Sequence, residues 1–223
     1  MNTSRIAIVG GTGQLGAAIA RRLAKAGQSV VIGSRDAGKA SATAAALGAE
    51  LGRTLEGVAN AQAAALGDVV ILTVPFASQA TTLQEIAPHV AGKILVDTTV
   101  PLMPPKVMRV QLPAEGSAAV RAQQLLGEGV RVVSAFHNVA AHKLATDEHI
   151  ACDVLVFGDD KDARERVVEI VGQCGLRGLH GGPLVNSAAA EALTSVLIFV
   201  NKQYSVGGAG ICITGELKPP AAN

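Results

Sequence analysis

The chain of 223 residues is long enough for one α/β domain with a hydrophobic core. A net charge of +1, with four Phe, one Tyr and no Trp, argues against a nucleic-acid partner held by charge or base stacking. No apolar run reaches the roughly 20 residues that span a bilayer, so we expect no membrane partner. The scattered cysteines Cys152, Cys174 and Cys212 and the absence of a signal-peptide pattern favour a cytoplasmic protein.

Apolar runs of strand length alternate with helical patterns along the chain, which is typical of βαβ units. The predicted strands are 5–10, 29–33, 68–74, 93–99, 131–136 and 153–158, with a last short strand at 175–180. The predicted helices follow the first strand and then cover 36–48, 116–126, 162–174 and 187–202. The fold class is therefore α/β, with a doubly wound and mostly parallel sheet. The proline-rich start of 101–129 predicts a long surface loop, and loops of that length are often functional.

The stretch "IVGGTGQLG" follows the first strand and opens the first helix. Gly11, Gly13 and Gly16 have the G-x-G-x-x-G spacing that lets a backbone approach a pyrophosphate at a helix N-terminus. Gly10, Gly13 and Gly16 also fit the spacing of short-chain dehydrogenases. Those enzymes use a Tyr-x-x-x-Lys pair, which this chain lacks because its one tyrosine, Tyr204, is followed four residues later by glycine.

The end of the second strand reads "GSR" where NAD-binding chains usually carry an acid. Ser34 and Arg35 offer a hydroxyl and a guanidinium, which suit the 2′-phosphate of NADP, and Lys39 adds a positive charge one turn later. Thr12 can also reach that phosphate. A solvated Arg and Lys at a helix start is the alternative, with Asp36 as the helix N-cap. We predict NADP as the cofactor.

The motifs "GGTGQLG", "IGSR", "LTVPF", "VVSAFHNVAAHKLA", "VFGDD", "GLRGLHGGPLVNS" and "GAGICITG" together resemble the NADPH-dependent F420 reductases, over roughly 5–215. This family implies reversible hydride transfer between NADP(H) and F420, an 8-hydroxy-5-deazaflavin coenzyme. It also implies a Rossmann-like domain, which we place at 1–182. A small C-terminal helical subdomain at 183–223 would close the cleft.

The resemblance implies cofactor contacts at matching positions of this sequence. It places Thr12, Gly13, Gln14 and Leu15 at the pyrophosphate, and Ser34, Arg35 and Lys39 at the 2′-phosphate. The residues it implies beside the ribose and nicotinamide are Val74, Val100, Leu102 and Ala141. Val74 ends one predicted strand, and Val100 and Leu102 follow another, where ligands of open parallel sheets lie. Ordinary core packing remains an alternative for each of these apolar residues.

His137 is the polar candidate beside the nicotinamide, because it follows "VVSAF" at a strand end. It is predicted as the catalytic residue, orienting the deazaflavin or stabilising charge on its ring, and a purely structural role stays open. Asn186 is predicted near the deazaflavin cleft, and the alternative is that it or Ser187 serves only as a helix N-cap. The histidines lack metal-ligand spacing, so no metal is predicted.

The sequence departs from the family at two places. Some relatives carry a basic residue after the Asn-Ser pair and near Cys212, whereas this chain has Ala188 and a thiol. These changes put the second substrate in doubt. Two alternatives to F420 reduction stay open, namely an NADPH-dependent reductase of a flavin, ferric chelate, carbonyl or imine, and a non-enzymatic NADP sensor. A homodimer is also expected, with the alanine-rich C-terminal helix and the proline-rich loop as its candidate surface.

Overall fold

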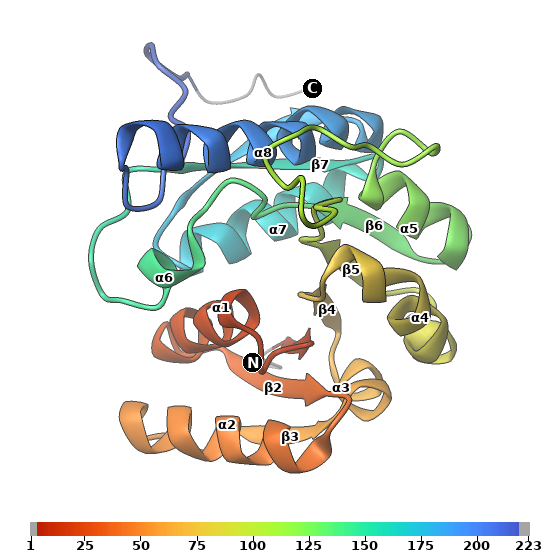
Figure 1. Ribbon diagram of the computed structural model, residues 1–223. Helices are drawn as coiled ribbons and strands as arrows, with labels where there is room; N and C mark the ends of the chain where they lie inside the picture. Colours follow the sequence, from red (N-terminus) through yellow and green to blue (C-terminus); the bar gives the residue numbers. More distant parts are fainter. Residues whose placement is uncertain (1–3, 219–223) are drawn as a thin grey trace.

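The computed structural model describes residues 4–218, which build an eight-stranded sheet covered by helices on both faces (Figure 1). The strands are β1 (Arg5–Val9), β2 (Ser29–Ser34), β3 (Glu56–Ala59), β4 (Val69–Leu72), β5 (Ile94–Asp97), β6 (Arg131–Ser134), β7 (Asp153–Gly158) and β8 (Arg177–Gly182). Their order in the sheet is β3-β2-β1-β4-β5-β6-β7-β8. The chain starts in the middle of the sheet, builds one edge, and returns to build the other.

The helices connect these strands and form the two outer layers. They are α1 (Gln14–Lys25), α2 (Ala37–Leu51), α3 (Asn60–Leu66), α4 (Phe76–Ile86), α5 (Ala118–Leu126), α6 (Ala141–Leu144), α7 (Lys161–Gln173) and α8 (Ser187–Tyr204), with 3-10 turns η1 (Ala87–His89) and η2 (Leu184–Asn186). One core cluster packs α1, α2 and α7 against the sheet, and a second cluster packs α3, α4 and α5 on the opposite face. The predicted α/β, doubly wound fold is confirmed.

Alternating residues of the central strands supply the two cores. Ile6 and Ile8 of β1 join the cluster with α1, whereas Ala7 and Val9 join the cluster with α3. Because both faces of these strands are covered, they read as continuous apolar runs rather than as alternating ones. This is why the strands were visible in the sequence.

The sheet is parallel except where β6 meets β7. Ser134 pairs with Phe157, and Val133 pairs with Gly158, so the end of β7 lies beside the end of β6. Phe157 is also level with Gly182 at the end of β8. The chain after β8 therefore arrives near the carboxyl ends of the parallel strands, where α8 begins.

Helix α8 is tied to this edge by buried polar contacts. The two carboxyl oxygens of Glu191 accept hydrogen bonds from the backbone N–H groups of Ala118 (2.6 Å) and Ala119 (3.1 Å) at the start of α5. The Asn138 amide donates to the Ala190 carbonyl at 2.9 Å. Among the described residues, the stretch Leu184–Tyr204 has the length and the apolar composition of a helix that could cross a membrane. The hydrogen bonds of Glu191 and Asn138 instead hold this helix against the rest of the domain.

Several elements differ from the sequence prediction. Strand β3 and helices α3, α4 and α6 were missed: β3, α3 and α6 are short, and the polar residues of α4 mask its apolar spacing. The predicted strand 131–136 ends at Ser134, since Phe136 has a left-handed φ of 66° that breaks the extended backbone. The predicted strand 68–74 ends at Leu72, which frees Thr73, Val74 and Pro75 to form the edge of a cavity.

Candidate functional site

The glycine loop after β1 is shaped by close backbone contacts. Gly10 has a φ of 76°, and a Cβ atom there would lie 2.7 Å from Val74 Cγ1 and 2.9 Å from the Thr73 carbonyl oxygen. A Cβ at Gly16 would lie 2.8 Å from Gly11 Cα, so the first turn of α1 packs directly on the loop. Larger residues would push the loop away from the strand ends. The predicted role of glycine at this turn is consistent with these distances.

The start of α1 is open to a negatively charged ligand. Gly13 occupies the N-cap position without a side-chain cap, and the first turn carries no acidic residue. The N–H groups of such a turn, together with the helix dipole, favour an anion. Gln14 follows as the first residue of α1, while Leu15 is partly buried and packs against the hydrophobic core.

The residues after β2 lie beside this loop. The Thr12 hydroxyl donates a hydrogen bond to the Ser34 Oγ at 3.4 Å, and the backbone N–H of Asp36 donates to the same oxygen at 3.2 Å. Arg35 and Lys39 are exposed, and within residues 4–218 neither forms an ion pair. The Asp36 carboxylate accepts from the Lys39 N–H, so Asp36 is the N-cap of α2, as anticipated. Two positive charges thus stand free at the end of β2.

A cavity of about 160 Å³ gathers several predicted residues at the point where the strand order reverses. Ligands of open α/β sheets bind at such a point. The lining residues are Gly10, Thr12, Gly13, Ser34, Arg35, Asn60, Thr73, Val74, Pro75, Ser78 and Thr82. The lining contains hydroxyls, an amide and a guanidinium, but no carboxylate. This composition fits a phosphorylated nucleoside.

Five lining residues were missed by the sequence analysis, namely Asn60, Thr73, Pro75, Ser78 and Thr82. Thr73 and Pro75 flank Val74 at the end of β4, so their position in "LTVPF" was the available signal. Asn60 follows β3, which the sequence did not reveal. Ser78 and Thr82 lie on α4, a helix that the sequence reading also missed.

Gln14 and Ala141 line a different cavity, of about 530 Å³, between α1, α2 and α6. Ala141 is the first residue of α6, and Figure 1 shows this short helix beside α1. Both cavities reach the start of α1, since Gly13 lines the first and Gln14 the second. The structure therefore brings Ala141 close to the start of α1.

Val100 and Leu102 follow β5 and are half-buried, with the Leu102 N–H donating to the Val100 carbonyl at 2.7 Å. They begin the irregular segment that leads to α5. Neither residue lines either of these two cavities. Their predicted contact with the nicotinamide is therefore supported only by their position after a parallel strand.

His137 lies three residues after β6 and is buried. Its Nε2 is 3.1 Å from the Ser134 Oγ, while its Nδ1 has no hydrogen-bond partner within residues 4–218. Burial lowers the pKa of His137 to about 4, so the imidazole is neutral near pH 7. A neutral imidazole with one free ring nitrogen can donate or accept one hydrogen bond but does not carry charge.

Asn186 is exposed and lies in η2, where its amide donates to the Gly181 carbonyl at 3.1 Å. It lines neither the 160 Å³ nor the 530 Å³ cavity. It occupies the N-cap position of α8 but makes no side-chain cap hydrogen bond. Ser187 instead donates to the Ser117 Oγ at 2.8 Å. The capping alternative is therefore wrong for both side chains.

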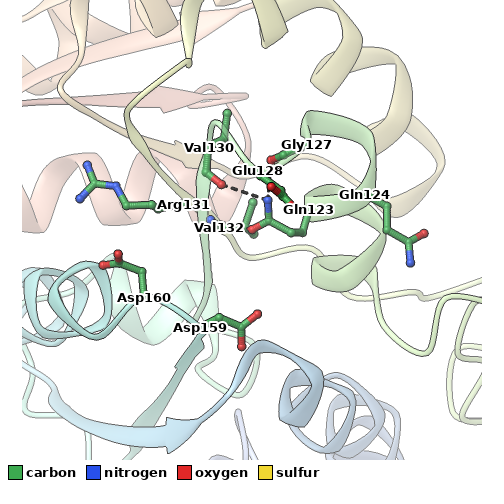
Figure 2. Close-up of a pocket in the computed structure, with 9 residues that line it drawn as sticks. All are labelled: Gln123, Gln124, Gly127, Glu128, Val130, Arg131, Val132, Asp159 and Asp160. Carbon is green, nitrogen blue, oxygen red and sulfur yellow. Dashed lines mark hydrogen bonds between the residues drawn. The ribbon is translucent and has the colours of Figure 1, made fainter.

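A third cavity, of about 630 Å³, lies between α5, β6 and the turn after β7 (Figure 2). Several of its polar groups are engaged within the fold: Gln123 donates to the Val130 carbonyl, and Asp159 and Asp160 accept from the N–H groups of Leu184 and Ala163. No residue of the predicted site lines it. Within residues 4–218 there is also no cluster of three His, Cys, Asp or Glu side chains that could hold a metal ion.

Comparisons with known proteins agree with this geometry. Residues 5–101 match the family model described as NADP oxidoreductase, coenzyme F420-dependent. The chain is 42% identical to the F420-dependent NADP reductase of Methanothermobacter thermautotrophicus, and the alignment covers 94% of both chains. The chain belongs to this family. The F420-dependent NADP reductase of Methanocaldococcus jannaschii is 39% identical over 94% of this chain and 98% of its own length.

A solved structure from Arthrobacter sp. has the same fold over nearly the whole chain. It is a candidate F420-dependent NADP reductase that is 26% identical, with a TM-score of 0.81, covering 95% of this chain and 100% of its own. The resemblance to the family that the sequence motifs indicated is confirmed.

Proposed function

We propose that this protein transfers a hydride between NADP(H) and the deazaflavin coenzyme F420. The observation that carries the proposal is the cavity at the switch point, where Ser34 and Arg35 replace the acid typical of NAD sites. The relatives named F420-dependent NADP reductase, aligned over 94% of the chain, support the choice of second substrate.

The adenosine end of NADP(H) is assigned to that cavity. The 2′-phosphate would contact Ser34, Arg35, Lys39 and Thr12, because these supply hydroxyl donors and two unpaired cations. The pyrophosphate would contact Gly11, Thr12, Gly13, Gln14, Leu15 and Gly16, in the uncapped first turn of α1 and the loop before it.

The nicotinamide end is assigned to the carboxyl ends of β4 and β5, with Val74, Val100, Leu102 and Ala141 as the proposed borders. Apolar borders suit a ring that changes between charged and neutral forms and must exclude water. NADPH supplies the hydride, and because it passes directly to another carbon, no side-chain base is required. The protein's part is to hold two flat rings at reacting distance.

His137 is proposed as the polar contact at this end. Its free Nδ1 and its neutral state suit a hydrogen bond to a ring substituent rather than proton transfer. Asn186 is proposed as a contact of the second substrate, although its amide is at present engaged with Gly181. Binding would have to break this hydrogen bond to turn the amide toward a ligand.

We divide the chain into a nucleotide-binding part, 1–182, and a smaller part, 183–223, that covers the carboxyl edge of the sheet through α8. The Glu191 and Asn138 hydrogen bonds support this covering role over the described residues. A homodimer through α8 is proposed as well. Val196 and Phe199 are 46% and 51% exposed on this helix, and Val110 of the neighbouring loop is 49% exposed, which suits an apolar contact between copies.

The alternatives make different demands on the site. A flavin, ferric-chelate or other small-molecule reductase would keep the NADP half and change the acceptor, and an NADP sensor would need no second substrate. The near full-length alignment with reductases favours the enzyme. A cytoplasmic location is proposed from three free cysteines among the described residues.

The decisive experiment mixes purified protein with NADPH and oxidised F420 and follows the loss of the deazaflavin absorbance. We expect turnover with F420 and none with a flavin under the same conditions. Turnover with the flavin alone would replace F420 with another acceptor. NADPH binding without turnover of any acceptor would favour the sensor.

A further inference from the structure

Asn60 occupies an unusual position under the glycine loop. It is the first residue of α3, directly after β3, and only 1% of its surface is exposed. Its Oδ1 accepts a hydrogen bond from the backbone N–H of Gly10 at 3.2 Å. The same oxygen is 3.1 Å from where a Cβ of Gly33 would be, so the amide is wedged between the ends of β1 and β2.

The other end of this amide is unsatisfied. Asn60 Nδ2 is buried and has no hydrogen-bond partner within residues 4–218. The contact of Oδ1 with Gly10 fixes which way the amide faces, so a flip would remove one hydrogen bond without providing another. Buried amide donors are almost always paired in folded proteins, and an open one calls for a partner that binds there.

The cavity that Asn60 lines identifies that partner. Ser34 and Arg35 line this cavity together with residues of the β4–α4 region, namely Val74, Pro75, Ser78 and Thr82. The lining thus combines a phosphate-binding pair with apolar and hydroxyl side chains, and a nucleoside offers ring nitrogens and ribose oxygens as hydrogen-bond acceptors. A buried N–H donor complements such acceptors.

We propose that Asn60 is a specificity-determining residue of the nucleotide site, whose Nδ2 donates a hydrogen bond to the adenosine moiety of NADP(H). The inference rests on the proposed function only in that the cavity holds a dinucleotide. One side chain then links two parts of the site: its oxygen accepts from Gly10 in the loop, and its nitrogen donates a hydrogen bond to the nucleoside. Binding of the nucleoside would therefore also hold the loop in place.

Binding of 2′,5′-ADP tests this role, because that ligand carries the adenosine and the 2′-phosphate without the nicotinamide. We expect Asn60→Ala to raise the dissociation constant measured by calorimetry about tenfold, equivalent to about 1.4 kcal/mol. Asn60→Asp keeps the acceptor for Gly10 but replaces the donor by a carboxylate, and should weaken binding further. Gln173→Ala removes another amide with a buried unpartnered atom, outside the cavity, and should leave binding unchanged.

A direct measurement on the unaltered protein accompanies the variants. In nitrogen-15 spectra of the wild type, the side-chain N–H signals of Asn60 should shift when 2′,5′-ADP is added. They are assigned through correlations within the residue, so this result does not depend on any variant folding. Unmoved Asn60 signals, or an Asn60→Ala protein with wild-type affinity, would overturn the proposal.

The outcomes also separate this inference from the proposed function. A protein that shows the Asn60 shifts but does not reduce F420 with NADPH keeps the role of Asn60 and loses the proposed acceptor. A wild-type protein without affinity for 2′,5′-ADP refutes both.

Discussion

The hydroxyl of Thr12 in the glycine loop donates a hydrogen bond to the Ser34 Oγ at the end of β2, at a distance of 3.4 Å. Residues 22 positions apart are thereby joined into one wall of the 160 Å³ cavity. Arg35 follows directly and lines the same cavity. The loop proposed for the pyrophosphate and the pair proposed for the 2′-phosphate are thus one continuous surface.

Replacing Arg35 by alanine should weaken the binding of NADPH but not that of NADH. The guanidinium contacts only the extra phosphate of NADPH in this assignment, so Arg35→Ala should raise the NADPH dissociation constant tenfold or more, about 1.4 kcal/mol. The affinity for NADH should barely change. Calorimetric titration with both cofactors measures this, with Arg166→Ala on α7 as a control. Equal weakening of both cofactors would contradict the assignment.

The fold and the phosphate loop could be read from the sequence because each rests on local patterns. Continuous apolar runs marked β1, β2, β4, β5, β6 and β7, and glycine spacing marked the loop. The cavity residues that come from helices α3 and α4 could not be predicted in this way. Thr82 and Asn60 reach the site from α4 and α3, which only the packing of both helices on the sheet brings together.

The residues around His137 show a second limit. The sequence placed it after a strand but could not show that one nitrogen faces Ser134 and the other has no partner. Similarly, nothing in "NSAAAE" showed that Glu191 would bond to the start of α5, more than 70 residues earlier. Such contacts depend on long-range packing, which residue patterns do not encode locally.

Glu191 should make the protein less stable as the pH rises. Burial raises the pKa of Glu191 to about 8, and the nearby Asp97 adds to the rise, while the N–H groups of Ala118 and Ala119 oppose it. The folded state therefore holds a proton that the unfolded state, with a pKa near 4.5, has released. The stabilisation is complete below pH 4.5 and is lost as the pH rises through 8.

Glu191→Gln tests this linkage because it cannot ionise. Urea unfolding of the wild type between pH 6.5 and 8 should show a falling free energy of unfolding, by at most about 1.4 kcal/mol per pH unit. The slope should flatten in Glu191→Gln and persist in the exposed control Glu165→Gln. Parallel pH profiles for the wild type and Glu191→Gln would show that Glu191 does not carry the linkage.

His137 should act without changing its charge in the working pH range. Since burial lowers its pKa to about 4, the rate of F420 reduction should show no inflection near pH 6.5. His137→Gln keeps a hydrogen-bonding side chain of different shape, and should lower kcat about tenfold while leaving the KM for NADPH unchanged. Steady-state rates from pH 5.5 to 8 measure both. An inflection near 6.5 that vanishes in His137→Gln would mean that the imidazole ionises during turnover.

Phe199 should be central to the proposed contact between two copies of the chain. It is 51% exposed on α8, one turn from Val196, and only 28% of the apolar window within Leu184–Tyr204 is buried. Phe199→Asp would place a charge in an apolar contact, so sedimentation should shift from the mass of two chains to that of one. Leu66→Asp, at an exposed apolar position on α3, is the matched control and should leave the mass unchanged.

Because Phe199 lines neither the 160 Å³ nor the 530 Å³ cavity, the affinity for NADPH should survive dissociation. A wild-type protein that sediments as one chain at every concentration would remove α8 as a contact between copies, and its apolar face would then need another explanation.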